Sequence, residues 1–375
     1  MSNQYTSFHP TPRTLMGPGP SDVHPRVTAA MGQPTIGHLD PEFVGLMDDI
    51  KGLLRFAFRT ENRMTFPLSA PGSAAMEAAF ANILEPGDKA IVCINGVFGK
   101  RMLENVQRMG GEAITVEDDW GTAVSPEKVA TALQNHPDAK VLAFVHAETS
   151  TGACSDAQAL CALARQHDCL TIVDSVTGLA GVPLLVDDWQ ADIVYSGTQK
   201  CLSCPPGISL MTYSERAEAA VRNRTHPVQS WFMDLSLLMS YWDGAGGRAY
   251  HHTAPVNAMY ALHESLLMLH EEGLEASWAR HRTQHEALAS GLEALGFRFV
   301  VDQPYRLPQL NSVWLPEGVD DAQGRKRLLS EFNLEVGAGL GDFAGKVWRI
   351  GLMGYSARSE NVALCLSALT AVVND

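Results

Sequence analysis

Short apolar runs alternate with amphipathic stretches over the first two thirds of the chain. The apolar runs are typical of strands that are buried on both faces, and they cover 64–69, 90–94, 113–116, 141–145, 170–173, 193–195 and 208–212. Between them, apolar residues recur at helical spacing over 40–59, 72–84, 98–109, 126–134 and 155–166. This alternation predicts an open α/β fold, in which helices cover both faces of a mostly parallel sheet.

The pattern changes in the last third of the chain. It stays helical from 253 to 295, and short strands and helices then follow at 298–301, 312–315, 320–332, 347–350 and 360–373. These elements predict a second, smaller α+β unit. We therefore expect an N-terminal extension over 1–20, a large domain over 21–272 and a small domain over 273–375.

Composition narrows the classes of function. The 375 residues include 42 acidic and 28 basic side chains, for a net charge of −14, which argues against nucleic acid as a partner. The apolar runs are shorter than the roughly 20 residues that cross a bilayer, and the N-terminus lacks a signal-peptide pattern. Seven cysteines, an odd number, are typical of free thiols in a reducing compartment. We expect a cytoplasmic protein with no membrane or nucleic-acid partner.

Ligands of open α/β sheets bind beyond the carboxyl ends of the strands. Lys200 and Asp174 both follow apolar runs there. A lone lysine is most often a solvated charge, whereas a lysine in a desolvated cleft has a lowered pKa and forms Schiff bases. Asp174 either caps the next helix or pairs with a pyridinium nitrogen. The residues alone leave both alternatives open.

Two further strand ends carry candidate binding groups. Gly72 and Ser73 open a helix with small residues, whose free backbone N–H groups suit a phosphate, although many helices begin in this way. Phe98 is either a core residue or a ring that stacks on a flat cofactor.

Metal chemistry has weaker support. Cys201 and Cys204 have CxxC spacing, but a zinc site needs a second pair. His281 and His285 lie one helical turn apart, and we expect them on a solvated face.

Several motifs in order along the chain match one family. They are 16–20 (MGPGP), 173–176 (VDSV), 195–201 (YSGTQKC) with 205–207 (PPG), 250–253 (YHHT) and 349–354 (RIGLMG). With them the chain resembles the class V, fold-type I aminotransferases, particularly the alanine–glyoxylate and serine–pyruvate branch. That resemblance implies a large domain built on a mostly parallel seven-stranded sheet, with pyridoxal 5′-phosphate as cofactor and a homodimer that shares its active sites.

The resemblance also implies roles for individual residues. Lys200 would hold the cofactor as an internal aldimine, Asp174 would pair with its ring nitrogen, and Phe98 would stack on the ring. Thr149 would lie near the phenolic oxygen. The phosphate would be bound by Gly72, Ser73 and Gln199 of one subunit and by Tyr250 and Thr253 of the other. Arg349 would bind the substrate carboxylate, in a substrate site that also includes Gly19, His38 and Trp231.

These roles imply ping-pong transamination from alanine or serine to glyoxylate or pyruvate. Ser73 stands where some relatives carry histidine, and Phe98 where the animal enzymes carry tryptophan. His38 and Trp231 replace a glutamine and an asparagine of the ureidoglycine–glyoxylate relatives, and a bulky Trp231 favours a small amino donor. (S)-Ureidoglycine–glyoxylate aminotransferase is therefore the alternative function.

More distant alternatives fit the residues less well. Desulfurase and lyase relatives usually carry histidine where this chain has Gln199. An NAD-dependent oxidoreductase would need Gly-x-Gly-x-x-Gly after the first strand, and 70–73 (APGS) does not supply it. A binding protein that keeps the cofactor without turnover is disfavoured by the presence of both Lys200 and Arg349.

Overall fold

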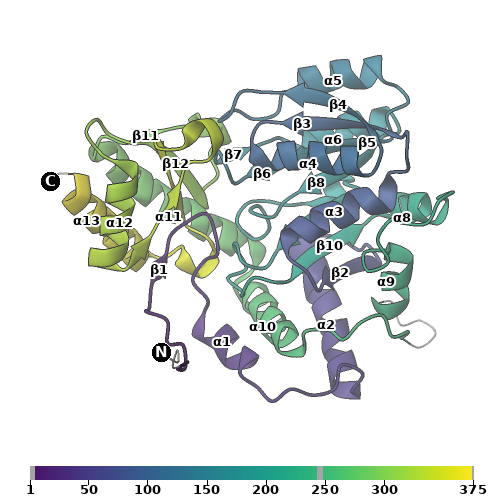
Figure 1. The fold of residues 1–375 in the computed structure, drawn as a ribbon, viewed down its shortest axis with the longest axis horizontal. Helices are drawn as coiled ribbons and strands as arrows, with labels where there is room; N and C mark the ends of the chain where they lie inside the picture. The colour runs from purple at the N-terminus through teal and green to yellow at the C-terminus, as the bar shows by residue number, and fades with distance from the viewer. Residues whose placement is uncertain (1–4, 243–247, 374–375) are drawn as a thin grey trace.

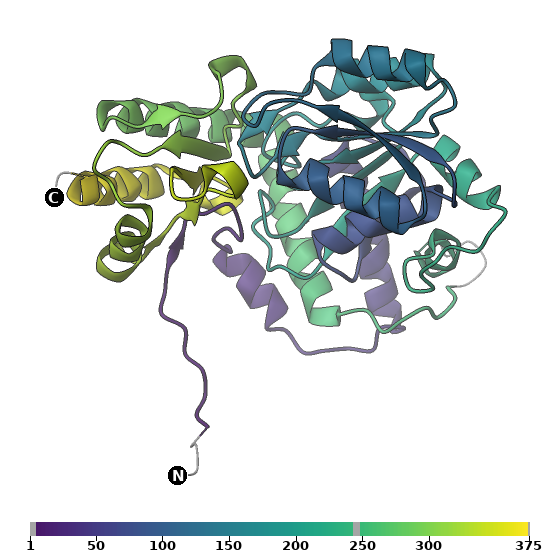
Figure 2. The same ribbon diagram turned by 45° about the horizontal axis from the view of Figure 1, so that its top comes forward.

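The computed structural model describes residues 5–242 and 248–373, which form a large and a small domain side by side (Figures 1 and 2). The large domain is built on a seven-stranded sheet. Its order is β2 (Met64–Leu68), β10 (Ser209–Tyr213), β9 (Ile193–Gly197), β8 (Leu170–Asp174), β5 (Val141–Val145), β3 (Lys89–Ile94) and β4 (Glu112–Glu117). Only β10 runs antiparallel to its neighbours β2 and β9. The predicted mostly parallel sheet is confirmed, strand by strand.

Helices cover both faces of this sheet, as the spacing predicted (Figure 1). The predicted helices are α2 (Pro41–Phe58), α3 (Gly72–Ile83), α4 (Val97–Arg108), α5 (Pro126–Asn135) and α6 (Ala157–Gln166). In α2 the sequence sets the start directly, because the Asp40 side chain accepts a hydrogen bond from Glu42 N and Pro41 occupies the first turn.

Several short elements of the large domain were not predicted. They are the helices α1 (Pro25–Met31), α7 (Val186–Trp189), α8 (Glu215–Arg222) and α9 (Leu235–Trp242), and a two-stranded ribbon of β6 (Ala147–Glu148) and β7 (Ala153–Cys154).

The predicted helical stretch 253–295 is two helices. α10 (Val256–Glu272) packs against α1 and α2, and α11 (Leu274–Ala294) begins after Gly273, whose φ of 85° breaks the helix. α11 contributes Leu274 to the core of the large domain and Leu288 to that of the small domain.

The small domain has a four-stranded sheet and a core of its own. The sheet order is β11 (Arg298–Phe299), β12 (Leu310–Trp314), β15 (Val347–Gly351) and β14 (Gly337–Ala338), and α11, α12 (Asp321–Phe332) and α13 (Ser359–Val373) pack with it. The N-terminal segment joins this domain, because β1 (Thr14–Leu15) pairs with β13 (Leu334–Glu335) and Met16 is buried in its core. Single 3₁₀ turns lie at Gln303–Tyr305, Gly341–Phe343 and Gly354–Ser356.

The topology places the carboxyl ends of β5, β8 and β9 next to one another, because these three strands are parallel neighbours. The residues that follow them therefore share one edge of the sheet. Within the described part of the chain, no helix is both long and apolar enough to cross a membrane.

Candidate active site

Lys200 is buried at this sheet edge, three residues beyond β9, and only 9% of it is exposed. Its Nζ donates a hydrogen bond to the Pro18 carbonyl oxygen. A Cβ at Gly19 would lie 2.5 Å from Nζ, so glycine is required for this close approach. Burial, and next the positive charge of Arg349, lower the pKa of Lys200 to about 8. Of the two alternatives for this lysine, the structure therefore supports a desolvated amine over a solvated surface charge.

Asp174 ends β8 and is also buried. Its Oδ1 accepts a hydrogen bond from Val176 N and its Oδ2 accepts one from the Tyr195 hydroxyl, each at 2.9 Å. Burial raises the pKa of Asp174 to about 7, while both hydrogen bonds act in the opposite direction. No helix begins directly after Asp174, since the segment that follows is a series of turns. Its carboxylate is thus not a helix cap.

Arg349 reaches this site from β15 of the small domain. Its Nε donates to the Ala338 carbonyl at 2.8 Å and its Nη1 donates to the Thr149 carbonyl at 3.2 Å. Burial lowers its pKa to about 10, so the guanidinium still carries its charge at neutral pH. Thr149 itself is buried, with its hydroxyl bonded to that of Thr177. The Arg349 guanidinium of the small domain therefore lies near the Lys200 amine and the Asp174 carboxylate of the large domain.

Glu148, which was not predicted as a site residue, is fully buried beside this group. Its carboxyl accepts hydrogen bonds from Ser150 N at 3.0 Å and from Phe98 N at 3.3 Å. Burial raises the pKa of Glu148, although the hydrogen bonds from these two donors act to lower it. It thereby links β6 to the first turn of α4, which carries Phe98. The available signal was its place three residues beyond the end of the apolar strand β5.

The start of α3 offers backbone groups that suit a phosphate. Pro71 occupies the cap position and supplies no side-chain hydrogen bond, so the N–H groups of Gly72 and Ser73 point out of the first turn. The Gln199 side chain folds back over Gly197. A Cβ at Gly197 would lie 2.7 Å from the Gln199 amide oxygen. Together with the buried amine and carboxylate, these groups fit pyridoxal 5′-phosphate, which needs a lysine, an acid at its ring nitrogen and a site for its phosphate.

The other predicted residues form a separate cluster, which is exposed except for the half-buried His38. Trp231 is 64% exposed and stacks on His251, and Tyr250 is 63% exposed and contacts the His38 ring. Thr253 is exposed and lies 3.5 Å from Tyr250, hydroxyl to hydroxyl. Among the residues that the structure describes, no hydrogen bond or ring contact joins His38, Trp231, Tyr250 or Thr253 to Lys200, Asp174 or Arg349.

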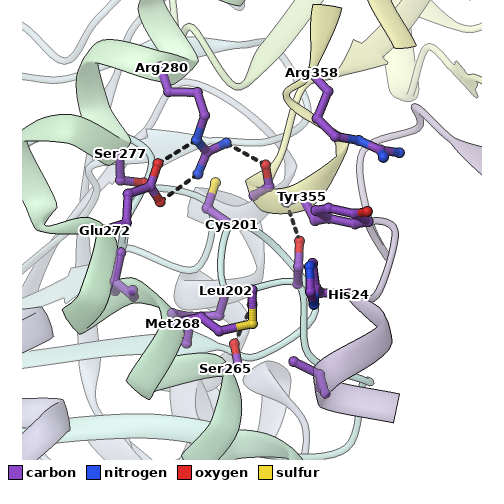
Figure 3. Close-up of a pocket in the computed structure, with 14 residues that line it drawn as sticks. His24, Cys201, Leu202, Ser265, Met268, Glu272, Ser277, Arg280, Tyr355 and Arg358 are labelled. Atoms are coloured by element: carbon purple, nitrogen blue, oxygen red, sulfur yellow. Dashed lines mark hydrogen bonds and ion pairs between the residues drawn. The ribbon is translucent and has the colours of Figure 1, made fainter. Parts of the chain in front are cut away.

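A cavity of about 370 Å³ lies beyond Lys200, lined by Cys201, Leu202 and Ser203, which follow it (Figure 3). None of the predicted site residues lines it. Figure 3 shows Arg280 paired with Glu272 along one wall, with N–O distances of 2.5 and 2.8 Å. Arg280 and Glu272 are thus already engaged with each other. The candidate active site is elsewhere, because none of its residues lines this cavity.

The described residues contain no group of three or more His, Cys, Asp or Glu side chains placed to hold a metal. Cys201 is buried, and its thiol lies 3.5 Å from the Thr177 carbonyl. The expectation of a solvated face is wrong for His281, which is fully buried. Its Nε2 accepts a hydrogen bond from Gly354 N, and its Nδ1 donates one to the Ser277 carbonyl oxygen. The histidine fills the gap between α11 and the loop at 354, which sequence spacing does not reveal.

Comparison with known proteins gives consistent matches over nearly the whole chain. The profile of the family Aminotransferase class-V matches residues 38–358. The (S)-ureidoglycine–glyoxylate transaminase of Bacillus subtilis (strain 168) is 38% identical, over 96% of this chain and 90% of that protein. The alanine–glyoxylate aminotransferase of Callithrix jacchus is 40% identical, over 95% and 86%. The solved structure of an alanine–glyoxylate aminotransferase from Nostoc sp. superposes with a TM-score of 0.96, at 45% identity over 99% of this chain and 97% of that one.

Proposed function

Because the chain belongs to the class V aminotransferase family, whose cofactor is pyridoxal 5′-phosphate, we propose that it transfers the amino group of alanine or serine to glyoxylate or pyruvate. The observation that carries this proposal is the buried group of Lys200, Asp174 and Arg349. An amine, an acid and a carboxylate-binding cation at one sheet edge are the groups that transamination of an α-amino acid requires.

Lys200 is proposed to hold the cofactor and to move the proton. When bound, the cofactor supplies an acceptor for the electrons released as the Cα–H bond breaks. The lowered pKa of Lys200 leaves roughly one tenth of its amine neutral at pH 7. Nζ would take the proton from the substrate Cα as a base and donate it to the cofactor's C4′ carbon as an acid.

The residues around Lys200 are proposed to orient the cofactor. Asp174 carries a carboxylate at the buried end of β8 and would pair with the ring nitrogen. Phe98 would stack on the ring and Thr149 would lie near its phenolic oxygen. The phosphate would be bound by the first turn of α3, at Gly72 and Ser73, and by Gln199.

Arg349 is proposed to bind the substrate carboxylate. Its bonds to the Ala338 and Thr149 carbonyls fix the guanidinium plane and leave Nη2 to reach the substrate. Gly19, which lies against Lys200, would leave room for the substrate Cα.

A homodimer with shared sites would use the exposed cluster. Tyr250 and Thr253 of the partner subunit would bind the phosphate, with the partner subunit's His38 and Trp231 at the substrate. The exposure of two large aromatic side chains there supports a covered surface in the working protein. We also propose a cytoplasmic location, which suits the seven free cysteines.

(S)-Ureidoglycine–glyoxylate transamination is the second candidate, because the Bacillus subtilis relative of that name is 38% identical. His38 and Trp231 favour the first candidate, since neither side chain offers the amide that suits a ureido group. A lyase or desulfurase reaction on the same fold is the more remote alternative.

The deciding experiment is the visible absorption spectrum of the purified protein with L-alanine, L-serine or a ureido amino acid, each added without an oxo acid. Bleaching of the yellow band by alanine or serine supports the proposal. Bleaching by the ureido amino acid alone supports the second candidate. A yellow band that no donor bleaches would contradict transamination, and absence of a band after adding the cofactor would contradict the assignment of Lys200.

A further inference from the structure

The carboxyl group of Asp174 is held by a residue to which no role has been given. Tyr195 lies on β9 directly opposite Asp174 on β8 in the parallel register. Its hydroxyl donates to Asp174 Oδ2 at 2.9 Å, while Val176 N donates to Oδ1. Tyr195 is fully buried, so no water competes for this bond.

The backbone of Asp174 is already fixed by its neighbours. His146 N donates to the Asp174 carbonyl at 2.9 Å, and Ser175 N donates to the Tyr195 carbonyl at 2.9 Å. The main chain at the end of β8 is thus tied to the strands on both sides. The remaining freedom is rotation of the carboxyl group, and the Tyr195 hydroxyl opposes that rotation.

The charge of Asp174 depends on the same bond. Burial and the nearby Glu148 raise the pKa of Asp174, and the bonds from Val176 and Tyr195 lower it. Tyr195 remains a donor throughout, because burial and Asp174 raise its own pKa well above the ordinary value. Removal of the hydroxyl therefore favours a protonated carboxyl, which cannot pair with a protonated ring nitrogen.

We propose that Tyr195 is a positioning residue, which keeps the Asp174 carboxylate oriented and ionised toward the cofactor's ring nitrogen. The inference rests on the proposed function, because it takes Asp174 as the partner of that nitrogen. The tyrosine touches neither cofactor nor substrate in this role and acts through Asp174.

The test uses the full-length holoenzyme with Tyr195→Phe, and Tyr213→Phe as the matched control. Tyr213 is also buried, on the adjacent strand β10, and stacks on Phe66 without contacting Asp174. Three quantities are measured: the affinity of the cofactor-free protein for pyridoxal 5′-phosphate, the pH dependence of the bound cofactor's visible spectrum, and kcat and KM for the amino donor.

For Tyr195→Phe we expect affinity and kcat to fall about tenfold, which is the effect of losing one hydrogen bond to a charged group. We also expect a shifted spectral pH dependence and little change in KM, while Tyr213→Phe matches the wild type. Wild-type values in all three measurements for Tyr195→Phe would overturn the inference.

A second comparison covers the case in which Tyr195→Phe folds poorly. In an Asp174→Asn background the carboxylate is gone, so adding Tyr195→Phe should change cofactor affinity and spectrum no further. A further loss of the same size in that background would show that Tyr195 acts through general stability, and would overturn the inference. If the wild type itself binds no cofactor, the proposed function and the inference fail together, whereas a normal wild type with an unaffected Tyr195→Phe removes only the inference.

Discussion

Lys200 is the residue on which the chemistry depends, and its replacement gives the clearest prediction. Lys200→Ala should bind the cofactor without covalent attachment and lose transaminase turnover by about 10⁴-fold, the upper range for a lost acid–base group. The fold should remain, because a buried amine is exchanged for an apolar side chain. Absorbance after gel filtration, turnover and circular dichroism check these points, with the exposed Lys326→Ala as control. Full activity in Lys200→Ala would contradict the central assignment.

The pH dependence of cofactor capture follows from the same residue. Only the neutral amine attacks the cofactor's aldehyde, and with a pKa of about 8 roughly one tenth of Lys200 is neutral at pH 7. The rate at which the yellow band develops should therefore rise from pH 6 and level off above pH 8. Because Arg349 contributes to the lowered pKa, Arg349→Ala should move this plateau to higher pH. A wild-type rate that rises steadily to pH 10 would indicate an ordinary, solvated lysine.

Arg349 should matter for substrate binding, whereas the captured cofactor should stay bound without it. Arg349→Ala removes a buried charge that pairs with the substrate carboxylate, at a cost of about 3 kcal/mol in transition-state binding. This corresponds to roughly a hundredfold lower kcat/KM for the amino donor. The yellow band should persist. Arg298→Ala, an exposed arginine of the same domain, is the control, and an unchanged kcat/KM in Arg349→Ala would refute the assignment.

The candidate site could be predicted only where its residues follow apolar strands. Lys200 and Asp174 were found in this way, because buried parallel strands end at one sheet edge. Glu148 and Tyr195 were not singled out, since their importance comes from bonds to Phe98 and Asp174, residues distant in sequence. The role of Arg349 came from the family resemblance, because strand spacing does not show that β15 approaches the large domain.

At the scale of an element, the first turn of α4 is held in place by Gly96 and Glu148. The φ of Gly96 is 176°, an extended conformation open to any residue, so only space restricts this position. A Cβ there would lie 2.5 Å from the Ser150 hydroxyl oxygen and closer still to the Glu148 carboxyl. The first turn of α4 would then have to shift, and Phe98 with it.

Gly96→Ala should therefore destabilise the protein by about 2 kcal/mol, as overpacking in a tight site does. It should also weaken cofactor binding and alter the circular dichroism of the bound cofactor, because Phe98 no longer stacks in the same place. Chemical denaturation and a cofactor titration measure both effects. Gly45→Ala in α2, where a Cβ meets nothing within 4 Å, should leave stability unchanged or raise it. Equal behaviour of the two variants would contradict the role of the Gly96–Glu148 contact.

At the scale of the whole molecule, the sequence indicated the two domains but not how the chain joins them. Six strands of the large sheet are buried along nearly their whole length, and the edge strand β4 keeps a short apolar run at 113–116, which made all seven predictable. α1 was missed because only Val27 of its seven residues is buried, so no periodic pattern exists. The two-residue strands β1 and β13 arise from pairing between segments about 320 residues apart. The division between residues 272 and 273 stays a prediction.

The shared-site dimer is the proposal that concerns the whole molecule, and mixed dimers test it. One subunit carries Lys200→Ala and the other carries Tyr250→Ala with Thr253→Ala. If each site uses Lys200 of one subunit and Tyr250 and Thr253 of the other, every mixed dimer contains one intact site and one doubly altered site. Random pairing then restores about a quarter of wild-type activity at limiting cofactor, well above the mean of the two parent dimers.

The control for this experiment pairs two variants whose altered residues both belong to one chain's part of the site. Mixed dimers of Lys200→Ala and Asp174→Asn carry one defect in each site, because the Lys200 and Asp174 of one chain are buried at one sheet edge. No recovery is expected in that pairing. Activity of the first mixture at the mean of its parents would mean that the exposed cluster at Trp231 and Tyr250 serves another purpose. Recovery confined to the first mixture requires a site that two subunits complete together, and explains why large aromatic side chains stand exposed on a single chain.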